Sequence, residues 1–110
     1  MIDIEAFEHE IVERLKPLNP YKIILFGSYA SGSPEEESDV DLYIVTRDEF
    51  IPQNWREKSK IYLQFSQKLR DLQKKIPIDL IVHTKGMYEK FIDLNSSFYR
   101  DGILKGRQIW

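Results

Sequence analysis

The sequence has no cysteine and only two histidines, His9 and His83. Without cysteine the chain cannot have a disulfide framework, a thiol nucleophile or a zinc site built on thiolates. Two histidines are too few for a histidine-rich metal cage. The net charge of -2 gives no basic excess, so we expect no nucleic-acid partner held by phosphate contacts.

Long apolar runs are also absent, since none approaches the roughly 18 residues that a membrane span requires. The first residues, 1–5, show neither a basic flank nor an apolar signal core. We therefore expect a cytoplasmic protein that does not enter a membrane. The chain has 110 residues, 42% hydrophobic and 31% charged, which suits a single folded domain over residues 1–110.

Helical and strand-like patterns alternate along the chain in the order αβ(α)βαβα. This order predicts an α/β (α+β) fold in which helices pack on a small mixed β-sheet. The expected elements are a helix over 3–16, a strand over 21–26, a short helical turn within 29–38, a strand over 39–46, a helix over 54–75, a strand over 78–83 and a last helix with Met87, Phe91, Leu94 and Phe98 turned inward.

Three aspartates interrupt the apolar strand patterns. Asp39 and Asp41 are two residues apart, so both carboxylates leave the same face of a strand, with Cα atoms about 6.6 Å apart. Asp79 interrupts a strand that is otherwise apolar, and a buried carboxylate without a partner costs several kcal/mol. A shared cation would compensate it, and oxygen ligands select Mg²⁺ or Mn²⁺. Taken singly, these residues also fit a solvent-facing strand edge or a strand start bonded to backbone amides.

The order of the elements can bring these aspartates to one end of the sheet. Gly27 and Ser28 follow the first strand, and a connection of about ten residues then leads to Asp39 and Asp41, which suits antiparallel neighbours. Asp79 joins them if the third strand runs parallel to the second, with the long helix as the crossover. Gly27 and Ser28 alone fit a simple turn. Together the five residues predict a site for a metal and a nucleotide.

The chain resembles the polymerase-β-like nucleotidyltransferase superfamily at residues 25–30, LFGSYA, and 38–42, SDVDL, with Asp79 on a later strand. Within that superfamily it is most similar to the minimal nucleotidyltransferases (MNT), which pair with HEPN proteins in prokaryotic toxin–antitoxin modules. The likeness spans about residues 4–85.

The resemblance implies a role for each matching residue. Gly27 lets the backbone approach the triphosphate of ATP, and Ser28 binds a terminal phosphate. Asp39 and Asp41 hold two Mg²⁺ ions, for which Mn²⁺ is the alternative. Asp79 binds the catalytic metal and favours deprotonation of the attacking hydroxyl. The three aspartates are thus the expected catalytic residues and metal ligands.

The resemblance also implies a function. The protein would transfer AMP from ATP to the hydroxyl group of a tyrosine on a partner HEPN ribonuclease toxin. The protein would then be an antitoxin. Two alternatives stay open: a non-catalytic antitoxin that blocks its partner by binding, and a nucleotidyltransferase for a small hydroxyl compound. Because the chain is short, the acceptor must come from a partner chain or from a second subunit of a homo-oligomer.

Two further positions bear on the site. Ser31 stands where many relatives have Arg or Lys, so the contact made by that charge is either absent or supplied elsewhere, for which Lys22, Arg47 and Lys85 are the candidates. His83 lies on a predicted strand, and we interpret it as a structural histidine in preference to a catalytic one.

Overall fold

The computed structural model describes residues 3–26 and 40–110. The predicted helical turn within 29–38 lies outside the described residues. The elements are α1 (Ile4–Leu15), η1 (Lys16–Leu18), β1 (Lys22–Phe26), β2 (Val40–Val45), α2 (Trp55–Lys75), β3 (Ile78–His83), α3 (Lys85–Asp93), the short π-helix η3 (Phe98–Ile103) and β4 (Arg107–Gln108).

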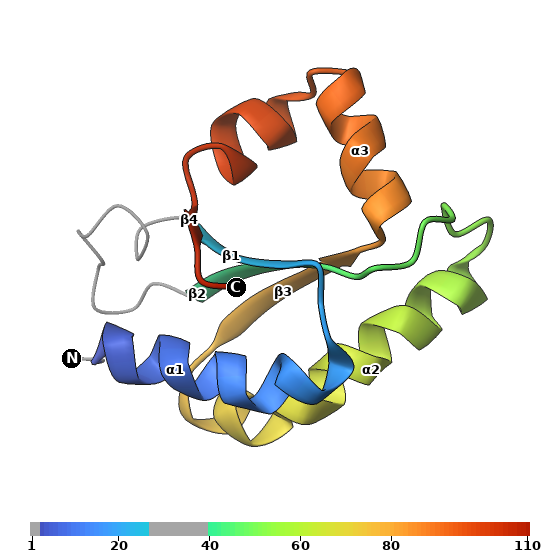
Figure 1. Ribbon diagram of the computed structural model, residues 1–110. Coiled ribbons are helices and arrows are strands. Elements are labelled where there is room, and N and C mark those ends of the chain that lie inside the picture. Colours follow the sequence, from blue (N-terminus) through green and yellow to red (C-terminus); the bar gives the residue numbers. More distant parts are fainter. Residues whose placement is uncertain (1–2, 27–39) are drawn as a thin grey trace.

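The sheet has four strands in the order β3-β2-β1-β4. Helices α1 and α2 cover one face, and α3 and η3 lie over the other (Figure 1). Strand β1 pairs antiparallel with both β2 and β4, whereas β2 and β3 are parallel and joined through α2. The expectation of a mixed sheet with helices packed on it is therefore confirmed.

Polar side chains fix the start of each helix. Asp3, Asn54 and Thr84 precede α1, α2 and α3, and each accepts a hydrogen bond from the backbone N–H three residues further on. These bonds satisfy amides that have no partner inside a helix. The predicted helix starts near Asp3 and Asn54 are confirmed.

Two hydrophobic clusters lie on opposite faces of the sheet. Because side chains alternate along a strand, β2 contributes to both clusters: Leu42 and Ile44 to the larger one, Tyr43 and Val45 to the smaller. The larger cluster lies between the sheet and helices α1 and α2. The smaller one lies between the sheet and α3 with η3. Within the described residues, no helix is long and apolar enough to cross a membrane.

The C-terminal part differs from the expectation of one helix with four inward residues. Helix α3 ends at Asp93, and Leu94, which was expected to be buried, is 66% exposed. The reason is Asn95, whose φ of 48° is left-handed and ends the helical path. Phe98 therefore belongs to η3, where it is half-buried in the smaller cluster.

The chain then adds a strand that the sequence did not predict. In β4, Gln108 pairs with Ile24 of β1. Gly106 permits this approach, because a Cβ there would lie 2.5 Å from the Ile24 side chain. The indole N–H of Trp110 donates to the carbonyl of Pro20 at 2.8 Å and anchors the end of the tail.

Candidate functional site

Asp41 of β2 and Asp79 of β3 occupy paired positions in the parallel ladder. Neighbouring strands are about 4.8 Å apart, and the side chains of paired residues leave the same face of the sheet. On the other side of β2, Asp41 pairs with Phe26, the last residue of β1. The two carboxylates thus lie side by side at the end of the sheet where β1 ends.

Three of the five predicted site residues, Gly27, Ser28 and Asp39, lie outside the described residues. In the sequence, Gly27 directly follows Phe26, and Asp39 is two residues before Asp41. Over residues 3–26 and 40–110, no group of three or more His, Cys, Asp or Glu side chains could hold a metal. The described part of the chain therefore provides two of the three predicted ligands.

The environment of Asp79 corrects one expectation. The sequence suggested a buried carboxylate in need of a compensating group, but the Asp79 side chain is exposed. It lies second in β3, which is the outer strand of the sheet, so solvent reaches it from the edge. The argument from burial is wrong, and what remains is the alignment of Asp79 with the half-buried Asp41.

A buried aromatic group lies further along the same face. The hydroxyl of Tyr43 is 2.8 Å from Nδ1 of His83, and the imidazole stacks on Phe91 with ring centroids 5.2 Å apart. Burial lowers the pKa of His83 to about 4, with a smaller effect from Lys58. Burial also raises the pKa of the Tyr43 phenol. His83 is therefore neutral at physiological pH, and its packing among aromatic rings agrees with the interpretation of a structural histidine.

Lys22, Arg47 and Lys85 are the candidates to supply the charge that relatives have at position 31. All three lie around the ring of Tyr21. Lys22, Arg47 and Lys85 hold their cationic groups 5.7, 6.0 and 4.9 Å from the centre of that ring. Lys22 is four residues from the end of β1 that meets Asp41, which is about 13 Å along a strand. Their position therefore does not favour any of them as a cation beside the carboxylates.

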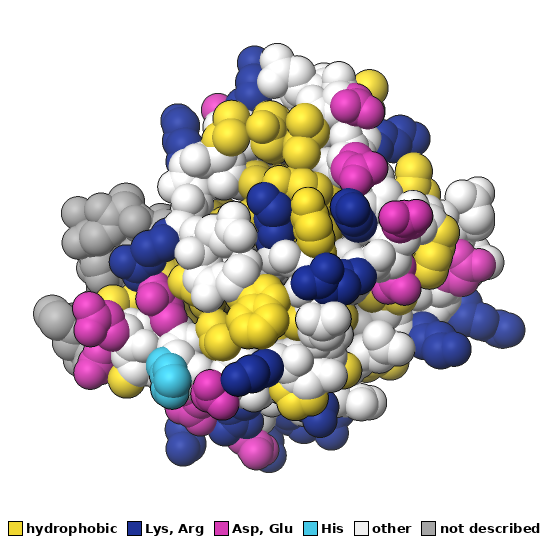
Figure 2. Space-filling view, in the orientation of Figure 1, with side chains coloured by type: hydrophobic (Ala, Val, Ile, Leu, Met, Phe, Trp, Pro, Cys, Tyr) yellow, Lys and Arg dark blue, Asp and Glu magenta, His cyan; other side chains and the backbone are white. Residues whose placement is uncertain are grey.

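Charges of both signs share the surface. Figure 2 shows basic side chains interspersed with acidic and hydrophobic ones on the face turned to the viewer. This mixture agrees with the small net charge of the chain.

Comparison with known proteins decides the family. Residues 8–109 match the family model described as a nucleotidyltransferase domain. The chain belongs to this nucleotidyltransferase family. Two curated relatives from Methanocaldococcus jannaschii are named as candidate protein adenylyltransferases. One is 36% identical over 89 residues, which cover 81% of this chain and 77% of the relative. The other is 40% identical over 90 residues, which cover 82% and 85%.

Solved structures share the fold of this nucleotidyltransferase. One is a crystal structure of a toxin–antitoxin with AMP-PNP, 23% identical, with a TM-score of 0.56. Another is a mutant of the toxin–antitoxin MntA–HpeT, 21% identical, with a TM-score of 0.56. Each match covers 94% of this chain and 72% of the other. These likenesses extend over nearly all of the chain and confirm the nucleotidyltransferase fold.

Proposed function

We propose that this nucleotidyltransferase moves AMP from ATP to a hydroxyl group on a HEPN-type toxin, and that it acts as the antitoxin of that toxin. The observation that carries the proposal is the pairing of Asp41 with Asp79 at the end of the sheet where β1 ends, in a chain of the nucleotidyltransferase family. The names of the two curated relatives support a protein acceptor. The similar toxin–antitoxin structures support the partner.

The carboxylates suit a hard divalent cation. Asp39, Asp41 and Asp79 would hold Mg²⁺, or Mn²⁺ in its place, because carboxylate oxygens are the ligands that these ions prefer. Two such ions, when bound, neutralise charge that develops on the transferred phosphate. Gly27 and Ser28 would bind the triphosphate through backbone amides and the Ser28 hydroxyl.

The reaction is a displacement at the α-phosphorus of ATP. The acceptor oxygen forms a bond to this phosphorus, the bond to the bridging oxygen of the β-phosphate breaks, and pyrophosphate leaves. The hydroxyl proton passes to solvent water, which reaches this edge of the sheet, and the exposed carboxylate of Asp79 favours this loss. A tyrosine on the toxin would supply the hydroxyl.

The strand order suits such a displacement, in which the attacking and leaving oxygens stand roughly in line across phosphorus. β2 lies between β1 and β3. The predicted triphosphate-binding residues Gly27 and Ser28 follow β1, whereas Asp79 lies on the outer strand β3. We therefore place the nucleotide on the β1 side of Asp41 and the acceptor on the β3 side.

Intact mass spectrometry of the co-purified HEPN-type toxin, before and after incubation with ATP and Mg²⁺, tests the proposal. We expect the toxin to gain the mass of AMP. Asp41→Asn and Asp79→Asn should each slow this gain by more than about 100-fold, because each removes a metal ligand. Asp71→Asn, an exposed carboxylate of α2, is the matched control and should transfer AMP normally.

The same experiment separates the alternatives. A bound and silenced toxin whose mass does not change would favour the non-catalytic antitoxin. AMP transfer to a small hydroxyl compound, with none to the toxin, would favour the small-molecule enzyme. Either result contradicts the proposal.

A further inference from the structure

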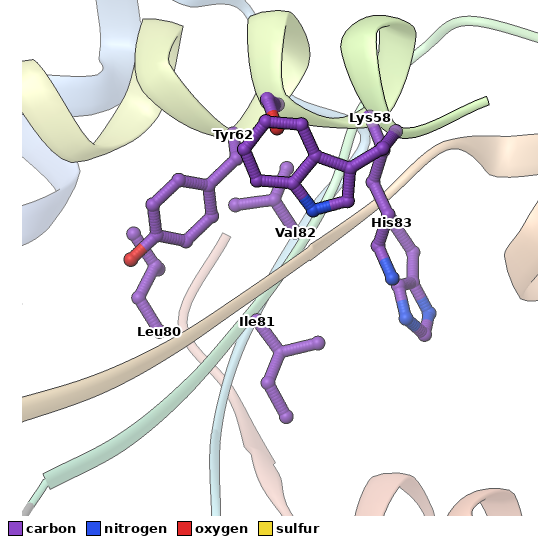
Figure 3. A pocket seen from close by; sticks show the side chains of 8 residues that line it. Lys58, Tyr62, Leu80, Ile81, Val82 and His83 are labelled. Carbon is purple, nitrogen blue, oxygen red and sulfur yellow. The ribbon is translucent and has the colours of Figure 1, made fainter. Parts of the chain in front are cut away.

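A groove of about 360 Å³ runs between α2 and the outer strand β3. Its helical wall includes Trp55, Lys58 and Tyr62, and its floor is β3 from Leu80 onward (Figure 3). Figure 3 shows Tyr62 reaching from α2 toward β3, and Ile81 pointing away from the helix. Asp79 directly precedes Leu80, so the groove begins at the end of β3 that carries Asp79, while the Asp79 carboxylate leaves the opposite face of the sheet.

The wall of the groove exposes large aromatic side chains. Trp55 is 82% exposed and Tyr62 is 36% exposed. They are seven residues apart, with Lys58 between them, so they share one face of α2. The core face of the helix is a different stripe, which includes Ile61 and Phe65. Exposed Trp and Tyr grouped in a groove are typical of protein–protein interfaces.

The floor of the groove is a sheet edge. Within the described part of the chain, β3 pairs with β2 only and is the last strand on its side. The carbonyls of Pro77 and His83 accept hydrogen bonds from backbone amides of the neighbouring strand. Because successive residues of a strand point their N–H and C=O groups to opposite sides, those of Leu80 and Val82 point away from β2. Such an edge can pair with a strand of another chain.

The groove also carries a cation. Among the described residues, no acidic side chain forms an ion pair with Lys58. Lys58 and His83 both line the groove, so this charge lies toward the end of β3 that is far from Asp79 (Figure 3). A segment lying there would therefore be complementary if it carried a carboxylate.

We propose that this groove binds an extended segment of the partner toxin as an added strand on β3. Apolar side chains of the segment pack on Trp55 and Tyr62, and an acidic side chain lies beside Lys58. The inference rests on the proposed function, and it names the surface that brings the acceptor to the catalytic end. A segment paired along β3 passes directly beside Asp79.

Binding of the purified HEPN-type toxin to variants of this chain, measured by isothermal titration calorimetry, tests the surface. Trp55→Ala and Lys58→Glu should each raise the Kd by about tenfold or more, as central interface residues do. Leu94→Ala, which truncates another exposed apolar residue, and Lys105→Glu, which reverses another exposed charge, should bind as the wild type does. Thermal unfolding of each variant shows that it is folded.

Amide exchange measured by NMR tests the mode of binding. When the toxin binds, the amide of Leu80 or Val82, or both, should become protected, because these amides point out of the sheet. The amide of Ile81 points toward β2 and should keep its protection. If neither Leu80 nor Val82 gains protection when the toxin is bound, strand addition is contradicted.

The outcomes distinguish this inference from the proposed function. Toxin binding that Trp55→Ala and Lys58→Glu leave unchanged overturns the inference even if AMP is transferred. Binding that both variants weaken, with no AMP transfer by the wild type, supports the surface and contradicts the enzyme. Failure of the wild type to bind the toxin contradicts both. A homodimer that Trp55→Ala dissociates would assign the groove to a second copy and also overturn the inference.

Discussion

Mild acid should destabilise this protein through His83. Burial lowers the pKa of its imidazole from the ordinary 6.5 to about 4. The unfolded chain therefore takes up a proton near pH 6.5 that the folded chain does not bind until about pH 4. The contribution of the neutral His83 to the free energy of unfolding is complete above pH 6.5, and it is lost as the pH falls toward 4. At about 1.36 kcal/mol per pKa unit, the full shift is worth roughly 3 kcal/mol, of which about 2 kcal/mol is lost by pH 5.

Urea unfolding at pH 7.5 and pH 5 measures this loss when the wild type is compared with the Tyr43→Phe/His83→Phe double variant. The double variant keeps two aromatic rings and removes both hydrogen-bonding partners, so that neither is left buried alone. The free energy of unfolding of the wild type should fall by about 2 kcal/mol more than that of the variant. Equal losses would refute the reasoning, because the carboxylates that titrate over the same range are common to both proteins.

Three other substitutions have defined effects. Asp79→Asn should leave the Tm within about 2 °C of the wild type, because the side chain is exposed, while AMP transfer to the toxin is lost in the mass assay. Asn54→Ala removes the cap of α2 and should lower the free energy of unfolding in urea by about 1 kcal/mol. Gly86→Ala places a Cβ against the carbonyl oxygen of Glu49, and thermal unfolding should show a loss of about 1–3 kcal/mol.

Chain connectivity explains why the strand pairing could be predicted. The link from β1 to β2 is short, which favours an antiparallel pair, and α2 is long enough to be the crossover of a parallel pair. These two statements alone bring Asp79 to the same end of the sheet as Asp41, whereas the exact register depends on side-chain packing. The paired positions of the two residues confirm them.

Features that depend on tertiary position could not be predicted in this way. The apolar neighbours of Asp79 suggested burial, but in this outer strand the Asp79 side chain is exposed although Leu80 and Val82 are buried. β4 has two residues, which is too few to show alternation. The end of α3 depends on the left-handed conformation of Asn95, a residue that also occurs within helices. The exposed Trp55 is apolar like a core residue, and only its position on α2 separates it from the core stripe.

The larger core also determines which way the carboxylates of the proposed site point. In β2, Leu42 and Ile44 are buried in that core, so Asp41 must leave the opposite face. Leu80 has the same relation to Asp79 in β3. A register slip of one residue would expose these apolar side chains, at about 1.5–3 kcal/mol each, and turn a carboxylate inward. Substitutions in the core should therefore lower activity by displacing the carboxylates, and assays far below the Tm separate this effect from unfolding.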